Sequence, residues 1–290
     1  MSLEVELKFL LPVSNADTLF ASLQQQSGAN WQFKAQHTLL NAYFDTADGW
    51  FRRHDIGLRT RQKNQQFEQT IKLPGVQQGA AHIRPEYNQP CADVLPKLTE
   101  FPAEIWPAGT SPAQLQSQLT ELFRTDFVRR SFLLQDAAGS LELVFDQGWV
   151  LAGDQQEPIA ELELELQSGD PALLFQLARR LLQHAPLLLG VQSKAERGYR
   201  LAQQQPLQRQ PFAPHSPLAA QLRWFLCQQI LHSQGVVGDA ALADDWQQWQ
   251  QHLHQQQPAL AATMPAAFAA EQATQRQLWL LDLTASLIAA

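Results

Sequence analysis

The chain has 290 residues, of which 45% are hydrophobic and 17% are charged, and its formal net charge is −7 at pH 7. These values are typical of a globular protein with one large domain or two, and the acidic balance argues against a nucleic-acid partner. Cys91 and Cys227 lie far apart without metal-ligand spacing, which favours a reducing compartment. We expect a cytoplasmic protein with no membrane partner, because no leader-like segment opens the chain and the apolar stretch at 278–290 is too short to span a bilayer.

Strand-like runs alternate with turns through the first two hundred residues. The pattern predicts strands at residues 3–11, 37–46, 56–63, 67–73, 81–88, 126–135, 140–151 and 158–167. It predicts helices at residues 14–26 and 171–183, the second after the helix-start signal Ser168-Gly169-Asp170-Pro171. A proline-rich segment at 89–112 is expected to form a surface excursion, and Asp146-Gln147-Gly148 is expected to bend the chain.

The composition changes at residues 203–217, where Gln, Pro and Arg dominate. Repeated prolines exclude regular structure there, so this segment is predicted to be a linker. Beyond it, runs rich in Ala, Leu and Gln predict helices at residues 218–233, 240–257 and 266–287. We therefore expect a strand-rich domain over 1–202, the linker, and a small helical appendage over 218–290.

Charged side chains recur at every second position in most of the predicted strands. Residues 3–9, for example, place two glutamates and a lysine on one face and apolar side chains on the other. A solvated sheet face would explain any one strand, but such faces usually mix in Ser, Thr and Gln. Here the positions are almost all carboxylates, arginines or lysines, which favours a closed barrel with a charged lumen and helices over its apolar outer face.

A charged lumen must be nearly neutral, since an unpaired buried charge costs several kcal/mol. The acidic candidates are Glu4, Glu6, Glu86, Asp146, Glu161, Glu163 and Glu165. The basic candidates, equal in number, are Lys8, Arg59, Arg61, Lys72, Arg84, Arg129 and Lys194. Arginine forks suit phosphate groups, and carboxylates suit Mg²⁺, which often bridges carboxylate and phosphate. The combination indicates metal-assisted hydrolysis of a phosphoanhydride.

The order of these motifs resembles the CYTH family of triphosphate tunnel metalloenzymes. The resemblance covers about residues 1–202 and begins with Glu4-x-Glu6-x-Lys8 at the start of the chain. The other matching segments are Tyr43-Phe44-Asp45-Thr46, Leu58-Arg59-Thr60-Arg61, Thr70-Ile71-Lys72, Arg84-Pro85-Glu86, Asp146, Glu161-x-Glu163-x-Glu165 and Ser193-Lys194. The layout is most similar to bacterial inorganic triphosphatases that carry a C-terminal histidine-rich helical (CHAD) domain.

The resemblance implies an α+β fold, with an eight-stranded antiparallel β-barrel tunnel and flanking helices. It implies hydrolysis of inorganic triphosphate to diphosphate and phosphate, with Mg²⁺ or Mn²⁺ as the cofactor. The implied catalytic residues are Glu4, Glu6, Glu86 and Lys72. The implied metal ligands are Glu4, Glu6, Asp146, Glu161, Glu163 and Glu165. The implied phosphate-binding residues are Lys8, Arg59, Arg61, Lys72, Arg84, Arg129, Arg130 and Lys194.

The sequence departs from the family pattern in two places. The sixth strand usually carries two basic residues two positions apart, but here Arg129 is followed by Arg130 and Ser131, so the second base is lost or displaced to Arg130. The helical stretch is also shorter than a full CHAD domain, and no polyphosphate-binding role is assigned to it. We further expect Tyr43 and Phe44 to pack in the core or at its rim.

Other functions remain open at this point. A class IV adenylate cyclase or a thiamine triphosphatase would share the tunnel chemistry, and a non-catalytic polyphosphate-binding module would share the charges. The sequence sets neither the preferred triphosphate nor the oligomeric state.

Overall fold

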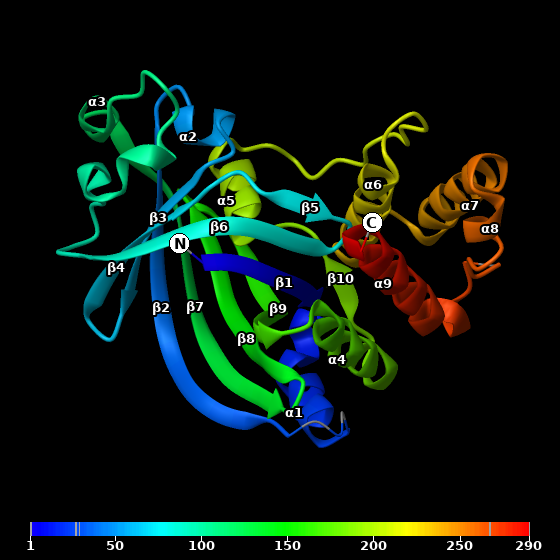
Figure 1. The fold of residues 1–290 in the computed structure, drawn as a ribbon. Helices are drawn as coiled ribbons and strands as arrows, with labels where there is room; N and C mark the ends of the chain where they lie inside the picture. The colour runs from blue at the N-terminus through cyan, green and yellow to red at the C-terminus, as the bar shows by residue number, and fades with distance from the viewer. Residues whose placement is uncertain (1, 27, 29, 267, 290) are drawn as a thin grey trace.

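The structure is a computed structural model that describes residues 2–26, 28, 30–266 and 268–289, and the backbone alone at residues 2–4, 78, 136 and 289. Its centre is an antiparallel β-barrel (Figure 1). The barrel strands are β1 (Ser2–Leu10), β2 (Gln32–Thr46), β3 (Gly57–Lys63), β4 (Gln66–Lys72), β6 (Ala81–Cys91), β7 (Leu119–Asp136), β8 (Gly139–Ala152) and β9 (Gln155–Gly169). Two short strands, β5 (Val76–Gln78) and β10 (Leu188–Gly190), extend the sheet beside β6 and β1.

Strand β1 closes the barrel. The strand order is β10-β1-β9-β8-β7-β2-β3-β4-β6-β5, and β1 also pairs with β6. One side of β1 pairs with β9 from Glu6 to Leu10, and the other pairs with β6 from Ser2 to Leu7. Because side chains alternate along each strand, closure brings one face of all eight strands into a common lumen. The expected eight-stranded tunnel fold is confirmed.

Apolar side chains point outward from the barrel and are covered by helices α1 (Ala16–Gln26) and α4 (Pro171–His184). The ring of Phe20 on α1 stacks on that of Phe145 on β8 with centroids 4.5 Å apart. Helix α4 begins where predicted, because the Asp170 side chain accepts a hydrogen bond from the Ala172 amide at 2.7 Å. The large hydrophobic core therefore lies outside the barrel, and the lumen is left to polar groups.

A second, smaller core lies over the other end of the barrel. Its elements are α2 (Trp50–Arg53), the 3-10 turns η2 (Leu98–Glu100) and η3 (Ala103–Ile105), and α3 (Pro112–Gln116). Phe51, Leu98 and Ile105 pack together there, so the proline-rich excursion is a folded cover. This cover begins after Cys91 rather than at the predicted residue 89, because β6 continues through residues 89–91.

Turn η1 (Val13–Asn15) lies between β1 and α1, and helix α5 (Lys194–Ala202) follows β10. The last helices of the chain, here called the helical region, are α6 (Leu218–Ser233), α7 (Asp239–Gln256), α8 (Pro258–Ala261), η4 (Ala270–Gln272) and α9 (Ala273–Ala289). Leu222 and Trp246 from this helical region belong to the same apolar cluster as Leu7 of β1. The helical region thus shares the outer core of the barrel.

Two strands begin well before their predicted bounds, and a third lacks a predicted bend. Strand β2 begins at Gln32 and β7 at Leu119, because the two pair along their whole length and polar residues there obscured the alternation. Strand β8 runs without a break through Asp146–Gly148, so the expected bend is wrong. Gly148 is needed there because a Cβ atom would lie 2.1 Å from the Asp126 carbonyl oxygen on β7. None of the helices in the described part of the chain has the length and apolar character that a bilayer crossing needs.

Candidate active site

The charged strand faces enclose a cavity of about 330 Å³ inside the barrel. The predicted site residues that line it are Glu6, Lys8, Arg59, Arg61, Lys72, Arg84, Glu86, Arg129, Glu163, Glu165 and Lys194. Asp146 and Glu161 are fully buried and contact Lys194 of this lining. The side chain of Glu4 falls outside the described part of the structure, so its two predicted roles stay predictions.

Asp146, Glu161 and Glu163 form a carboxylate cluster, here called the acidic triad. One carboxylate oxygen from each lies within 4.8 Å of the others. Strand register explains the cluster, because Asp146 on β8 pairs directly with Glu161 on β9, and Glu163 is the next residue on the same face of β9. The triad therefore consists of neighbouring lumen positions on two adjacent strands.

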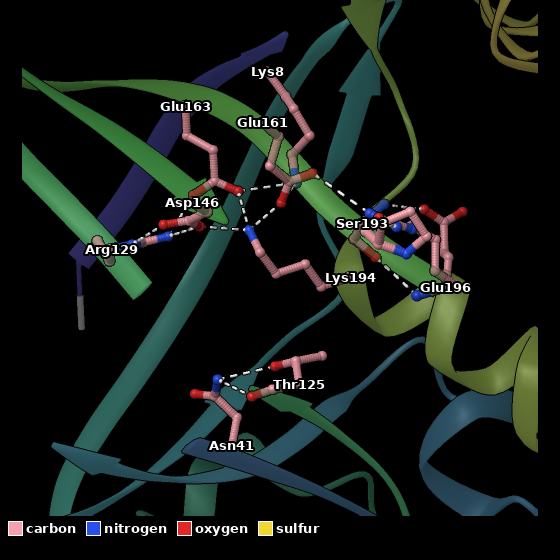
Figure 2. A network of polar contacts seen from close by, with 12 residues as sticks. Lys8, Asn41, Thr125, Arg129, Asp146, Glu161, Glu163, Ser193, Lys194 and Glu196 are labelled. Carbon is pink, nitrogen blue, oxygen red and sulfur yellow. Dashed lines mark hydrogen bonds and ion pairs between the residues drawn. The ribbon is translucent and has the colours of Figure 1, made fainter. Parts of the chain in front are cut away.

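Two lysines neutralise the acidic triad from opposite directions (Figure 2). Lys194, the first residue of α5, places Nζ 2.7 Å from Asp146 Oδ2 and 2.9 Å from Glu163 Oε1, and it also pairs with Glu161. Lys8 on β1 places Nζ 2.9 Å from Glu163 Oε1 and 3.5 Å from Glu161 Oε1. Burial disfavours the charged ammonium of Lys194, but the three carboxylates outweigh it and raise the pKa of Lys194.

Arg129 is a third cation at the acidic triad. Its Nε and Nη2 atoms donate to the two oxygens of Asp146, each at 2.7 Å, and Nη2 also donates to Glu163 Oε2 at 2.7 Å. The bidentate geometry follows from the direct pairing of Arg129 on β7 with Asp146 on β8. Burial alone would raise the pKa of Glu163, but Lys194, Lys8 and Arg129 hold it well below the usual range. Asp146, whose pKa is also lowered by Arg129 and Lys194, and Glu163 are therefore ionised at neutral pH.

The acidic triad fits a divalent cation with oxygen ligands. Both carboxylate oxygens of Glu161 are buried, and neither accepts a well-oriented hydrogen bond from the described residues. The ion pairs with Lys194 and Lys8 compensate the charge at Oε1, but buried acceptors without hydrogen bonds are costly unless another group satisfies them. The donor set is oxygen alone, which suits Mg²⁺ or Mn²⁺ better than softer metals.

The opposite wall of the cavity carries an excess of positive charge. Arg59 and Arg61 project from β3 beside Tyr43 of β2. Burial, followed by the charges of Arg59 and Arg129, lowers the pKa of Arg61 to about 9. Burial would raise the pKa of the Tyr43 phenol, but the neighbouring cations outweigh it and lower that pKa. The cations around Arg61 and Tyr43 contribute to both shifts, so this wall carries positive charge that would attract an anion.

Asn41 fixes the position of Arg61. Its Oδ1 accepts a hydrogen bond from Arg61 Nε at 2.7 Å. Its Nδ2 donates to the carbonyl oxygen of Thr125 at 3.0 Å and to Thr125 Oγ1 at 2.9 Å (Figure 2). Asn41 was not among the predicted site residues, although strand alternation places it on the same face as Tyr43.

Tyr43 and Phe44 are both buried in apolar clusters, which agrees with the expectation that they pack in the core or at its rim. Phe44 is buried in the smaller core with Phe51. Tyr43 stacks on Phe123 with ring centroids 4.5 Å apart, but it also lines the charged cavity. Alternation along β2 places the two side chains on opposite faces, and the pairing of β2 with β7 also shifts register between them, which has no signal in the sequence.

Lys72 and Glu86 form a separate ion pair on the cavity wall. They are direct partners on β4 and β6, and Lys72 Nζ lies 2.8 Å from Glu86 Oε2. Arg59 Nη2 approaches Glu86 Oε1 at 3.7 Å. Burial opposes ionisation of Glu86, but Lys72 and Arg59 lower its pKa to about 2. A carboxylate with this pKa is a poor proton acceptor at neutral pH.

Arg130 does not reach the cavity, which corrects its expected phosphate-binding role. It follows Arg129 directly, so its side chain lies on the outer face of β7. There its guanidinium lies 4.5 Å from the ring centroid of Phe145 and pairs with Asp17 of α1. Ser131 shares the face of Arg129 and is buried, but it does not belong to the described cavity lining.

The sequence of the chain matches a known protein family and a curated relative. A family model described as the CYTH domain matches residues 2–199. A curated relative named inorganic triphosphatase, from Haemophilus influenzae, is 34% identical over 185 residues, which are 60% of this chain and 51% of the relative. The chain thus spans about half the length of that relative.

Two solved structures also resemble the chain. A Hippeastrum protein described as having a dominant triphosphatase activity is 18% identical, with a TM-score of 0.49, over 68% of this chain and 96% of that protein. A protein from Pyrococcus horikoshii is 15% identical, with a TM-score of 0.45, over 68% of this chain and 99% of that protein. The family match ends at residue 199, before α6 begins.

Proposed function

Since the chain belongs to the CYTH domain family, we propose that it is a metal-dependent hydrolase that cleaves inorganic triphosphate to diphosphate and phosphate. The curated relative named inorganic triphosphatase supports this substrate. The proposal concerns the tunnel, because the family match covers residues 2–199.

One observation carries the proposal: Glu163 of the acidic triad and the arginine-rich wall line the same cavity of about 330 Å³. The triad alone would fit a cation, and the arginines alone would fit an anion. Their combination suits a polyanion that binds together with a divalent cation. A site of this kind needs no glycine-rich phosphate loop, because side chains supply the hydrogen-bond donors.

Asp146, Glu161 and Glu163 are the residues that would hold the cation. A divalent ion bound there would polarise a phosphoryl oxygen and stabilise the negative charge that develops during hydrolysis. We favour Mg²⁺ over Mn²⁺ as the physiological ion, because both take carboxylate oxygens and Mg²⁺ is the usual partner of phosphate chains. Glu6 and Glu165 line the same cavity and remain proposed further ligands.

The cationic side chains would bind and orient the phosphate chain. Arg59 and Arg61 project into the cavity from one wall, and Arg61 is held rigidly by Asn41. Lys8 and Lys194 pair with carboxylates and also line the cavity, so each can exchange a carboxylate partner for a phosphate oxygen. Fixing both ends of the chain in this way lowers the entropic cost of reaching the reactive geometry.

Glu86 and Lys72 were expected to act in catalysis. We propose that Glu86 positions Lys72 for a phosphate oxygen, because a pKa of about 2 makes Glu86 a weak base at neutral pH. Arg84 also lines the cavity and is proposed as a further phosphate contact. The group that activates water is then sought near the acidic triad.

We also propose a location for the protein, a partner and a relation for its C-terminal helices. A cytoplasmic location agrees with the two free cysteines, Cys91 and Cys227. We propose a small-molecule triphosphate as the partner, without nucleic acid or membrane. The relation of helices α6 to α9 to a CHAD domain is likewise a proposal, because the family match ends before them.

The test is phosphate release from purified protein supplied with tripolyphosphate, thiamine triphosphate or ATP, each with Mg²⁺ or Mn²⁺. We expect the highest kcat/KM with tripolyphosphate, and none with EDTA. The control is Glu161→Gln, which keeps the shape of a triad side chain but removes its charge.

Each alternative function gives a distinct result. Formation of cyclic AMP from ATP would favour an adenylate cyclase, and preferred cleavage of thiamine triphosphate would favour a thiamine triphosphatase. Binding of tripolyphosphate without phosphate release under any of these conditions would contradict hydrolysis and favour a binding module.

A further inference from the structure

The ammonium of Lys194 is positioned by the place where helix α5 begins. Lys194 is the first residue of α5, and its Nζ atom lies within 3 Å of both Asp146 and Glu163. The backbone at residue 194 must therefore be fixed for the side chain to reach the triad. A shift of this backbone would move the ammonium away from the carboxylates and from the cavity.

A capping box defines the start of α5. The Ser193 hydroxyl oxygen accepts a hydrogen bond from the Glu196 amide at 3.1 Å, and Glu196 Oε2 accepts one from the Ser193 amide at 2.8 Å (Figure 2). This reciprocal pair satisfies two amides that have no partner within the helix. It leaves the second carboxylate oxygen of Glu196 for another donor.

That donor comes from the helical region. Arg223 on α6 donates from Nη2 to Glu196 Oε1 at 2.5 Å and from Nε to Gln77 Oε1 on β5 at 2.8 Å. Gln77 in turn donates from Nε2 to the Val191 carbonyl oxygen at 3.3 Å, just ahead of α5. Arg223 thus connects both the cap of α5 and the segment that leads into it.

Helix α6 is itself held firmly against the barrel near this network. A Cβ atom at Gly79 would lie 2.4 Å from Leu222 Cδ2, so the turn between β5 and β6 contacts α6 closely. On α9, Thr284 Oγ1 accepts a hydrogen bond from the Ala80 amide at 3.4 Å. The position of Arg223 is therefore set by packing between the helical region and the barrel.

We propose that the helical region controls triphosphate binding through Arg223, a positioning residue that fixes Glu196 and thereby the ammonium of Lys194. This inference rests on the proposed role of Lys194 in the tunnel. The Arg223–Glu196 pair is partly exposed, with side-chain exposures of 33% and 41%. Its effect is therefore expected mainly on the geometry of the site, with little effect on global stability.

The test is the effect of Arg223→Met on tripolyphosphate binding, measured as Kd by calorimetry with EDTA and as KM with Mg²⁺. We expect both constants to rise roughly five- to tenfold, the size of a typical coupling between residues in one network. In a Lys194→Ala background the same substitution should have no further effect. Equal effects in the two backgrounds would overturn the proposal, because a general structural change would be additive.

The matched control is Arg179→Met. Arg179 on α4 pairs with Asp282 on α9, so it also joins the barrel side to the helical region but does not contact α5. We expect this variant to keep the wild-type Kd. Amide hydrogen exchange at residues 194–199 should become faster in Arg223→Met and remain unchanged in Arg179→Met. Unchanged exchange in both variants would overturn the proposal.

A second variant covers the case in which Arg223→Met does not fold. Glu196→Gln retains a side chain that can complete the capping box but removes the carboxylate charge that Arg223 binds. It should raise Kd like Arg223→Met, and a wild-type Kd would overturn the inference. The proposed function has its own criterion: if Lys194→Ala binds and turns over tripolyphosphate normally, the assignment of Lys194 is wrong.

Discussion

Lys194 Nζ lies 2.7 Å from Asp146 Oδ2, although Lys194 begins helix α5 and Asp146 lies in the middle of β8. The ammonium also pairs with Glu161 and Glu163, so a single side chain contacts the whole acidic triad. It occupies the position that a bound cation would compete for. Lys194 therefore compensates the charge of the triad and would compete with a metal ion for its carboxylates.

Lys194→Met should bind Mn²⁺ more tightly than wild type in the absence of triphosphate. Removing the ammonium leaves the acidic triad under-neutralised, and we expect Kd to fall roughly tenfold, equivalent to about 1.4 kcal/mol. Titration calorimetry with the metal alone measures this. Lys72→Met is the control, because Lys72 pairs with Glu86 rather than with the triad. Weaker Mn²⁺ binding by Lys194→Met would show that the cation binds elsewhere.

Glu161→Gln and Glu165→Gln should distinguish a ligand in the acidic triad from the further ligand that we propose at Glu165. Glu161 is fully buried in the acidic triad, whereas Glu165 lines the cavity but lies outside the triad. We expect Glu161→Gln to lower Mg²⁺-dependent kcat on the order of 100-fold or more, and Glu165→Gln to lower it less than about tenfold. Steady-state kinetics across Mg²⁺ concentrations gives both values. The reverse order would place the metal nearer the other end of the cavity.

Arg61→Met should weaken tripolyphosphate binding, and Arg130→Met should not. Arg61 points into the cavity and is oriented by Asn41, so its loss should raise KM roughly tenfold or more. Arg130 lies on the outer face, where it contacts Phe145 and pairs with Asp17. Its substitution should lower the Tm while KM stays within about twofold of wild type. A large KM effect from Arg130→Met would contradict this assignment.

Strand alternation was sufficient to predict most of the cavity lining. Once Glu6 and Lys8 were assigned to one face, the same rule correctly placed Arg59, Arg61 and Glu163 in the lumen. The rule also explains the error at Arg130, because a residue that follows a lumen residue in a strand must point outward. The family pattern of two basic residues on this strand had suggested that Arg130 replaces the missing base. Strand geometry excludes this, because Arg130 directly follows Arg129.

Other features depend on contacts between distant segments, which the sequence does not show. The bulge after Tyr43 arises from the long pairing of β2 with β7. Gly148 is needed because the Asp126 carbonyl approaches it closely, and this approach cannot be seen in the sequence. The glycine therefore suggested a bend at a position where the strand continues. The contact between Arg223 and Glu196 joins residues that lie on either side of the predicted linker at 203–217. Each of these features can be recognised only in the folded barrel, where the distant segments meet.

Glu86→Gln should destabilise the protein at neutral pH but less so in acid. Lys72 and Arg59 lower the pKa of Glu86 from 4.5 to about 2 despite its burial. Because the folded-state pKa is below the unfolded value, the stability contributed by the ionised carboxylate is fully present above about pH 4.5 and is lost as the pH falls toward 2. We expect Glu86→Gln to cost roughly 1–3 kcal/mol at pH 7 and less than half of that at pH 3.

Thermal unfolding of wild type and Glu86→Gln at pH 7, 4.5 and 3 measures this difference. Other carboxylates titrate over the same range in both proteins, so the difference in Tm between wild type and Glu86→Gln reports on Glu86, whereas neither Tm alone does. Asp282→Asn is the control, since Asp282 pairs with Arg179 at the surface with 52% of its side chain exposed. The difference in Tm between Asp282→Asn and wild type should be small at every pH. A difference in Tm for Glu86→Gln that is as large at pH 3 as at pH 7 would mean that the ion pair with Lys72 does not hold the carboxylate ionised.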